Sequence, residues 1–442
     1  MIDRCDIAVL GAGPAGCIAA AGLVRLGFKV AMITAARRIE TWEGISARAV
    51  ETLRSAGLNT AISKLEGEVV RQAHWNGFST AANRERIVNR LDFDEALQAD
   101  VVAAGVSLYQ ARVKSYSAAM DGWDVVGQSS SGTVQLHAGY LIEARGRQAP
   151  LLGGVRTSGP ASTALSQQWS LPQGAKGMTA VAGFPDGWAW FAAGHQHKAT
   201  LQLLVSSAKG DLPQRKDLRQ FYQHKLESIS ESVQWLANAQ PVGAVSARGA
   251  ATTITMLQSE RNFLRVGDAC VAVDPLSGHG IFEALGSGLA AVPVVNTIMR
   301  RPQDQETART FFRDRAAHGF LRYARIGRDF YAQEKRWSDR PFWRARQGWP
   351  DNRRAHVSPL ASKPEIVERP VVKDNFVALA EVVVTADHPR GVWQVAGVPL
   401  VPLLHLLRSG VSDTNTVAER FGRSLDDVSI ARQWLRYRTL LP

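Results

Sequence analysis

Six residues near the N-terminus have the types and the spacing that bind a phosphate. They are Gly11, Ala12, Gly13, Pro14, Ala15 and Gly16, in a G-x-G-x-x-G pattern. Gly11 permits a tight turn, Gly13 lets the backbone approach a pyrophosphate, and Gly16 lets a helix pack closely on a strand. A helix that begins at this turn would offer its N-terminal N–H groups to the phosphates. The pattern predicts a dinucleotide site, and the alternative is a glycine-rich turn that binds nothing.

A strand, a helix and a second strand must position this turn. We expect the first strand at residues 6–10, the helix at 17–26 and the second strand at 29–33. Thr34 then stands where such sites usually carry an acidic residue that holds the ribose. Its hydroxyl can still bond a ribose, with fewer acceptor sites than a carboxylate. The identity of the cofactor therefore cannot rest on this turn alone.

A second group of residues, far along the chain, makes the assignment more specific. Residues 263–268 form a strand that ends in Gly-Asp, residues 274–281 form a Pro/Gly turn that opens a long helix, and residues 143–147 read E-A-R-G-R. With the N-terminal glycine pattern, these segments are similar to the FAD-dependent monooxygenases of the aromatic hydroxylase and tryptophan halogenase superfamily. Three signatures in this order over about 280 residues are strong support for the resemblance.

The resemblance assigns roles around FAD. It implies that Asp268 holds a ribityl hydroxyl, that Arg90 lies near the flavin, and that Val113 lies near the adenine. It also implies that the turn lies against the isoalloxazine ring; the turn residues are Pro275, Ser277, Gly278, Gly280 and Ile281. A carboxylate accepts hydrogen bonds from polyol hydroxyls, and a helix N-terminus favours a flavin that becomes anionic on reduction.

The resemblance also implies a reaction at an electron-rich aromatic ring. In that chemistry O2 and reduced FAD give a flavin C4a-hydroperoxide, and the protein mainly positions the ring and excludes water. His279 and Glu43 are candidates for moving a proton, with Arg48 as the neighbour of Glu43. The structural alternatives are that His279 caps the helix and that Glu43 only pairs with Arg48.

Some positions resemble the halogenase branch, but the residues that carry halogenation differ. Residues 187–191 (GWAWF) resemble the W-x-W element of halogenases, without its proline. Ser277 occupies the place of an essential glutamate, and Lys64 is displaced from the place of the lysine that forms the halogenating agent. Halogenation is therefore disfavoured, and oxygen insertion by the flavin is expected.

The fold class that follows is α/β: a Rossmann-like FAD-binding domain interleaved with a β-sheet substrate domain, plus a small, mainly helical C-terminal module that resembles a helix-turn-helix. We expect the FAD-binding domain at residues 1–300, with the substrate-binding sheet at about 64–88 and 160–245. The remaining predicted parts are a basic, aromatic-rich helical region (301–357), a linker (358–373) and a helix-turn-helix or winged-helix-like docking module (374–442) with helices at 400–408, 414–421 and 424–437.

The charge of the chain points to an acidic partner. The 442 residues include 52 Lys and Arg against 40 Asp and Glu, a net charge of +12. Residues 300–354 hold 15 basic and 7 acidic residues, which places +8 of that charge in one segment. The last helix begins Ser424-Leu425-Asp426-Asp427, which would put two carboxylates where a recognition helix meets phosphates. We therefore expect no nucleic acid partner and a protein-docking role.

Together these features are similar, within the superfamily, to the monooxygenases of quinohemoprotein amine dehydrogenase maturation, which hydroxylate a tryptophan of a protein precursor to begin tryptophylquinone formation. The resemblance implies a peptide or protein substrate, acidic in view of the basic segment. The alternatives are a small-molecule aromatic hydroxylase or halogenase and, from another class, a DNA-binding flavoprotein regulator. Electrons would come from NAD(P)H or from a flavin reductase, since no separate nicotinamide fingerprint is visible.

Location and metal content follow from what the sequence lacks. The first residues have no secretory signal pattern, so we expect a cytoplasmic protein. The apolar stretch 278–299 has the length of a membrane span but contains His279 and Glu283, which favours a buried helix and no membrane contact. The three cysteines lie too far apart for metal-ligand spacing, so no metal site is expected.

Overall fold

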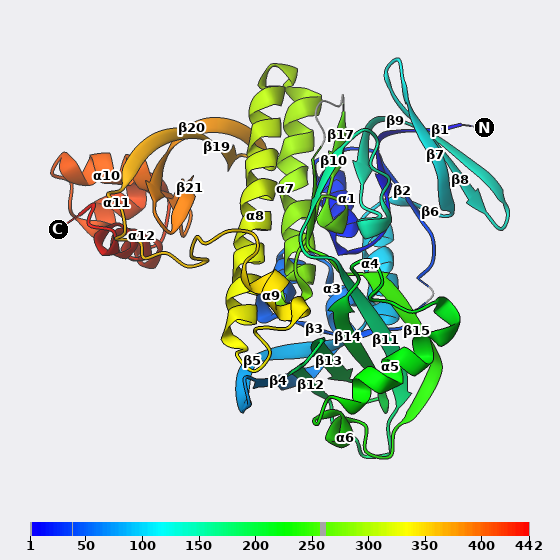
Figure 1. Ribbon diagram of the computed structural model, residues 1–442. Helices are drawn as coiled ribbons and strands as arrows, with labels where there is room; N and C mark the ends of the chain where they lie inside the picture. Colours follow the sequence, from blue (N-terminus) through cyan, green and yellow to red (C-terminus); the bar gives the residue numbers. More distant parts are fainter. Residues whose placement is uncertain (1, 38, 257–261, 442) are drawn as a thin grey trace. The chain divides into compact units, whose positions relative to one another are not determined.

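The computed structural model describes residues 2–37, 39–256 and 262–441 (Figure 1). The described chain is mixed α/β, as the sequence predicts. It divides into two compact units: Met1–Val295 with Ala316–Arg353, and Asn296–Arg315 with Arg354–Pro442. Each unit is therefore assembled from segments that are separated in the sequence.

The first unit contains a sheet of the dinucleotide-binding kind. Its order is β6 (Ser107–Gln110), β2 (Val30–Thr34), β1 (Asp3–Leu10), β9 (Gly132–Glu143), β8 (Gly122–Ser129) and β7 (Arg112–Ala119), with β17 (Phe263–Arg265) paired to β9. The central strands are parallel. Ile7 lies opposite Val30 and Tyr140, and the pairing continues in the same direction along all three strands as far as Leu10 of β1. Residues 7–10 of β1 are fully buried, as is usual where helices or loops cover both faces of a parallel sheet.

Small residues allow two helices of this unit to pack closely. Helix α1 (Pro14–Arg25) begins with a proline, whose fixed φ suits the first helical position. A Cβ atom on Gly22 would lie 2.5 Å from Val292 of α7 (Gly280–Arg300), and one on Gly288 would lie 2.4 Å from the carbonyl of Ala15. Among the described residues α7 alone has the length and hydropathy of a membrane span, but 61% of its most apolar window is buried inside the protein. It is a core helix, as predicted.

The second large sheet has eight strands. Its order is β15 (Gln240–Gly249), β11 (Ser162–Ser170), β14 (Lys198–Ser206), β13 (Gly187–Ala193), β12 (Met178–Phe184), β4 (Leu65–Trp75), β5 (Phe78–Asn89) and β3 (Trp42–Ile45). Residues 64–88 and 160–245, the segments predicted for this sheet, supply most of it, and β3 joins them at the edge. All pairings are antiparallel except that of β4 with β12.

Both faces of this sheet are covered over its centre. On one face Phe191 and Leu201 pack with Tyr222 of α5 (Leu218–Glu227) and Trp235 of α6 (Ser232–Trp235). On the other face Trp188 packs in a cluster completed by helices that follow much later in the chain. That cluster includes Tyr331 of α8 (Gln305–Gln333) and Phe342 and Trp343 of α9 (Pro341–Gln347). The predicted basic, aromatic-rich helical region thus supplies aromatic side chains to the core.

Shorter elements complete the first unit. They are α2 (Ala47–Ser55), α3 (Asn59–Ser63), α4 (Arg90–Ala103), and a small sheet of β10 (Val155–Ser158), β16 (Thr253–Met256) and β18 (Val271–Ala272). Asn89 caps α4, because its side chain accepts a hydrogen bond from the backbone of Leu91 at 2.9 Å. Arg90 is therefore held at the first position of the helix.

From Arg354 onward, the described part of the second unit combines a small antiparallel sheet with three helices, in addition to the end of α7 and the start of α8. The strands are β19 (Glu365–Lys373), β20 (Phe376–Thr385) and β21 (His388–Val392), followed by the pair β22 (Gln394–Val395) and β23 (Val398–Pro399). The helices are α10 (Leu400–Arg408), α11 (Thr414–Phe421) and α12 (Leu425–Tyr437), within one residue of their predicted bounds. The predicted linker, 358–373, is shorter than expected, because residues 365–373 pair with β20 as a strand.

Candidate active site

A large cavity lies among the described residues of the first unit, and the two predicted signatures line it. Its volume is about 1080 Å³. Both large sheets contribute to its walls: from the dinucleotide side come residues 11–15, Thr34 and Asp268, and from the eight-stranded sheet come Trp188, Trp190, Gln202 and Arg248. The size matches the upper end of small-molecule sites in proteins, as an extended dinucleotide requires.

The glycine turn has the geometry that its spacing predicts. Gly11 has a φ of +107°, and a Cβ atom there would lie 2.7 Å from the carbonyl oxygen of Ala144. A Cβ atom on Gly16 would lie 2.2 Å from the carbonyl oxygen of Gly11, so Gly16 holds the helix against the turn and does not line the cavity. Gly13 has nothing within 4 Å of its Cβ position. The N-terminus of α1, which no side chain caps, thus faces open space that suits a phosphate.

Thr34 closes the outer end of this site. Its hydroxyl accepts a hydrogen bond from the backbone of Ala12 at 3.4 Å, and it lies at the cavity wall together with Val113 of β7. This neutral hydroxyl takes the place usually held by an acidic residue, so Thr34 adds no negative charge at the predicted ribose position.

Arg90 lies at the cavity wall in an ion-pair network that the sequence did not reveal. Its guanidinium is 3.0 Å from the carboxylate of Glu43 and 3.0 Å from that of Asp94, which also pairs with Arg37 at 2.9 Å. Burial lowers the pKa of the Arg90 guanidinium, but the charges of Asp94 and Glu43 raise it by more, so the net shift is upward. Arg90 is therefore a permanent cation. Glu43 thus pairs with Arg90 and not with Arg48, which is exposed and does not line the cavity.

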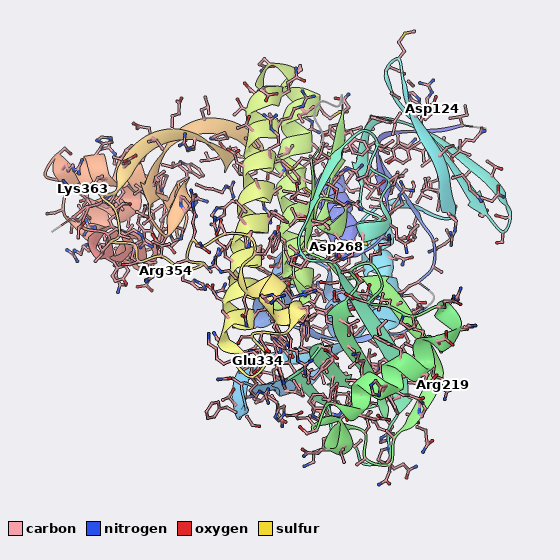
Figure 2. All side chains as sticks on the ribbon, in the orientation of Figure 1. Asp124, Arg219, Asp268, Glu334, Arg354 and Lys363 are labelled. Atoms are coloured by element: carbon pink, nitrogen blue, oxygen red, sulfur yellow. The ribbon has the colours of Figure 1, made fainter. Side chains whose placement is uncertain are left out.

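Asp268, which is labelled in Figure 2, forms a second charged pair at the cavity wall with Arg147. Nε of Arg147 lies 3.3 Å from Oδ2 of Asp268. Burial raises the pKa of the Asp268 carboxyl, and the positive charge of Arg147 offsets only part of this rise, so the pKa remains above its usual value. Arg147 also donates to the carbonyl of Ala251, which fixes its position beside the carboxylate. Asp268 therefore offers the cavity an oriented acceptor for hydroxyl groups.

The turn after β18 presents its backbone, and not its polar side chains, to the cavity. Pro275, Gly278, Gly280 and Ile281 line the cavity. The hydroxyl of Ser277 instead donates to the carbonyl of Asp274 at 2.7 Å. Gly278 has a φ of +67° and ends the turn in the left-handed region. Such a turn allows a flat ring to approach the backbone closely, which agrees with the predicted flavin position.

His279 is not brought to the cavity wall. Its ring lies 4.9 Å from the ring of Tyr323 on α8, and it is absent from the residues that line the cavity. Burial lowers the pKa of the imidazole, so the ring is neutral at neutral pH. The sequence placed His279 beside the flavin because it adjoins Gly278, but the start of α7 turns the side chain toward α8. Of the proton-transfer candidates, only Glu43 lies at the cavity.

A buried hydrogen-bond chain connects the eight-stranded sheet to this turn. The indole of Trp188 donates to the hydroxyl of Tyr331 at 3.0 Å, and that hydroxyl donates to the carboxylate of Asp274 at 3.2 Å. Asp274 in turn accepts from the backbone of Leu276 at 2.9 Å. Burial raises the pKa values of both Asp274 and Tyr331. These hydrogen bonds therefore fix the side chain of Trp188, at the cavity wall, relative to the turn that carries Pro275.

We expect Tyr331→Phe to lower the free energy of unfolding by about 1–3 kcal/mol, because it leaves the Trp188 indole and the Asp274 carboxylate each short of a buried partner. Urea unfolding measures this change. The control is Tyr437→Phe, since Tyr437 is 63% exposed and its loss should matter by less than about 0.5 kcal/mol. Equal stabilities of the two variants would contradict the coupling.

Arg71 reaches across the cavity from β4 and was not predicted. Its guanidinium lies 4.7 Å from the ring centre of Trp190 and pairs with the buried carboxylate of Glu85 at 2.5 Å. Its Nη1 atom lies 3.0 Å from the position that a Cβ atom on Gly278 would take. Arg71, Trp190 and Trp188 therefore form a cationic and aromatic wall next to the turn. No sequence motif marks Arg71, since its position depends on the pairing of β4 with β12 and β5.

The comparisons with known proteins agree with this geometry. The FAD binding domain family matches residues 4–286, well over half of the chain. The chain belongs to this family. It is an FAD-dependent monooxygenase, and its solved relatives include the peptidyl tryptophan dihydroxylase QhpG, essential for tryptophylquinone cofactor biogenesis. The two chains are 38% identical, with a TM-score of 0.83 over 99% of this chain and 100% of QhpG.

Two further relatives of the monooxygenase are halogenases. The flavin-dependent halogenase CmlS is 17% identical with a TM-score of 0.76, over 100% of this chain and 96% of that one, and it shows the shared fold. The tryptophan 2-halogenase of Chondromyces crocatus is 24% identical over 382 residues, or 77% of this chain and 70% of its own. In the monooxygenase Lys64 is exposed and does not line the cavity, and the Ser277 hydroxyl is bonded to Asp274.

The residues at the cavity fit FAD. Gly13 leaves room at a helix N-terminus for the pyrophosphate, Asp268 offers an acceptor for the ribityl chain, and the turn at Gly278 offers a backbone surface for the ring. When bound and reduced, FAD supplies the electrons that activate O2. Individual contacts to FAD remain our proposals for Gly11 to Ala15, Thr34, Arg90, Val113, Asp268 and the turn residues.

Proposed function

We propose that the monooxygenase hydroxylates a tryptophan side chain of a peptide or protein precursor during tryptophylquinone biogenesis. The observation that carries the proposal is the 38% identity to the peptidyl tryptophan dihydroxylase QhpG over 99% of this chain and all of that one. By analogy, two oxygen atoms enter the indole ring in successive cycles. Each cycle uses one O2, two protons and two electrons from NAD(P)H or a flavin reductase. One atom of that O2 enters the ring, and the other atom leaves as water.

The chain's own contribution is to hold the indole and keep water away from it. Trp188 is 3% exposed, and with Trp190 and Arg71 it gives the cavity an aromatic and cationic wall on which an indole can stack. Gln202 lies on the same wall, where its amide nitrogen donates to Ser166 at 2.9 Å. Its amide oxygen is thereby left as an acceptor for the indole N–H.

Glu43 is the proton carrier that the cavity supports best. It faces the cavity, and its carboxylate lies 3.0 Å from the guanidinium of Arg90, which holds it in place. A carboxylate at this position can accept the proton that the ring loses when the oxygen has been added. His279 lies against Tyr323 outside the cavity lining and is not needed for this role.

The basic segment supports an acidic partner less strongly than its charge suggests. Arg325 pairs with Asp351 at 2.6 Å, and its hydrogen bond lowers the pKa of that carboxyl to about 2. Arg346 is 3% exposed and donates to Ser162 and to the carbonyl of Ala161. These arginines are structural. A second candidate for docking is the second unit, where α12 exposes Leu425 (48%), Ile430 (50%) and Tyr437 (63%).

The proposal is tested by incubating the enzyme with FAD, a reductant and O2, together with an acidic peptide that contains one tryptophan. We expect the peptide mass to increase by the mass of one and then two oxygen atoms. Tandem mass spectrometry should locate the added mass on the tryptophan residue. Free tryptophan and a peptide with phenylalanine in place of tryptophan are the controls. Oxygen addition to free tryptophan but never to the peptide would overturn the proposal, and a chloride-dependent mass gain would indicate halogenation.

A further inference from the structure

One stretch of β5 has a free edge. The seven residues from Phe78 to Arg84 are all exposed; residues 78–81 and Arg84 pair with β4, and residues 82–83 between them form a bulge opposite Arg71. On the opposite side β3 pairs only with residues 86–89, and no other described strand lies beside residues 78–84. Exposed edges present unpaired N–H and C=O groups and usually carry features that block pairing. Here the stretch contains no proline, and Arg84 is its one charged residue.

The free stretch is held firmly at both ends. At one end the turn Asn76-Gly77 has positive φ angles of 52° and 79°, the signature of a tight two-residue hairpin. This turn is tied to the end of α8, because the indole of Trp75 donates to the carbonyl of Phe330 at 3.1 Å and the backbone of Asn76 donates to Glu334 at 2.7 Å. Glu334 is labelled in Figure 2. At the other end β3 covers residues 86–89. The edge is therefore preformed.

The two-residue turn determines which backbone groups face outward. It makes Trp75 and Phe78 a hydrogen-bonded pair, and bonded and non-bonded pairs alternate along an antiparallel ladder. Thr80 is therefore bonded inward to Ala73, whereas Ser79 and Ala81 direct their N–H and C=O groups away from β4. Small side chains at residues 79–82 leave these groups accessible.

The free edge continues directly to the cavity. Trp42 to Ile45 of β3 run along the edge of β5 and line the cavity, and the last pair is Ile45 with Arg86. Beyond Ser46 the chain leaves the edge to form α2. A strand laid beside residues 79–84 would therefore continue the line of β3, over about 16 Å, and end at the cavity wall. Arg71, on the neighbouring strand β4, already belongs to that wall.

We propose that this free edge binds the peptide substrate as an added β-strand, which carries its tryptophan to the cavity. The inference rests on the proposed function, since it requires a peptide substrate. Main-chain hydrogen bonds would supply affinity that does not depend on sequence, as in other cases of strand addition. Phe78, 70% exposed beside the half-buried Trp75, supplies an apolar contact at the far end. Alternate peptide side chains face the same side of the sheet as Arg71.

The test replaces Ala81 by proline, which removes one outward N–H group but no bond to β4. Proline is tolerated at an edge where the N–H faces solvent. The probe is a synthetic acidic peptide of about 12 residues, long enough to span the edge, with one central tryptophan. We expect Ala81→Pro to raise KM for this peptide about fivefold to tenfold, the effect of one lost hydrogen bond with its neighbours. Ala81→Thr keeps the N–H group and should leave KM unchanged.

A second measurement needs no variant. Hydrogen exchange of the unmodified enzyme, with and without the peptide, should show slower exchange at residues 79 and 81. Peptide hydroxylation without this protection, or an equal loss in Ala81→Thr and Ala81→Pro, would overturn the edge inference and leave the proposed function intact. A peptide that the unmodified enzyme never hydroxylates would overturn both.

Discussion

Asp268→Ala is expected to weaken FAD binding about 10-fold to 100-fold, the largest effect of any single change at the cavity. The carboxylate is oriented by Arg147 at 3.3 Å and faces the cavity, so it can accept charged hydrogen bonds from the ribityl chain. Such bonds contribute about 1.5–3 kcal/mol each, and about 1.4 kcal/mol corresponds to a tenfold change in Kd. Titration of flavin-stripped protein with FAD, followed by the change in flavin fluorescence, measures the loss.

Asp268→Asn is the matched control for this prediction. The amide keeps the shape and one acceptor, so FAD binding should weaken less than in the alanine variant. The asparagine variant should also differ from the native enzyme in the pH dependence of FAD binding, because its amide does not titrate. Burial raises the pKa of Asp268, so native FAD affinity should fall on acidification at a higher pH than an ordinary aspartate would give, whereas the asparagine variant should lack this loss. Unchanged flavin occupancy in Asp268→Ala would show that another group holds the ribityl chain.

Gly16→Ala and Gly13→Ala are expected to fail in different ways, although the two glycines belong to one motif. A Cβ atom on Gly16 would lie 2.2 Å from the carbonyl oxygen of Gly11, and backbone cannot move aside as a flexible side chain can. We expect Gly16→Ala to lower the free energy of unfolding by about 1–3 kcal/mol or more, the usual cost of overpacking. Urea unfolding of the flavin-free protein measures it.

Gly13→Ala should leave that free energy nearly unchanged. Its Cβ atom would meet nothing within 4 Å, and its backbone, with φ of −80° and ψ of 178°, is open to any residue. The added methyl group would instead occupy the space into which the N-terminus of α1 opens, so FAD affinity should fall. A Gly13→Ala protein that binds FAD normally would place the pyrophosphate elsewhere, and a Gly16→Ala protein of normal stability would contradict the packing argument.

The parts of the molecule that the sequence predicted well are those that local chemistry determines. The helices of the second unit have strong local end signals: Ser424 and Asp427 form a capping box, and Gly422 ends α11 in the left-handed region. The cavity residues found from sequence likewise lie on turns with distinctive glycine spacing. Both kinds of signal act within a few residues and need no knowledge of distant contacts.

The residues that the sequence missed depend on contacts between distant segments. Arg71 reaches the cavity because β4 pairs in parallel with β12, more than 100 residues later. Glu43 pairs with Arg90, 47 residues away, and not with its near neighbour Arg48. His279 lies against Tyr323 because α8 returns beside α7. Arg325 and Arg346 of the basic segment likewise have partners, Asp351 and Ser162, that only the fold reveals.

The position of Trp343 and Tyr331 in the core also sets an order for synthesis. Both side chains are at most 1% exposed and pack on Trp188, yet they follow the 20-residue segment Asn296–Arg315 that belongs to the other unit. While a ribosome makes the chain, the first 295 residues therefore leave one face of the eight-stranded sheet uncovered until residue 343 has emerged. The family match ends at residue 286, so the segment that it covers lacks the side chains, Tyr331 and Trp343, that complete its own core.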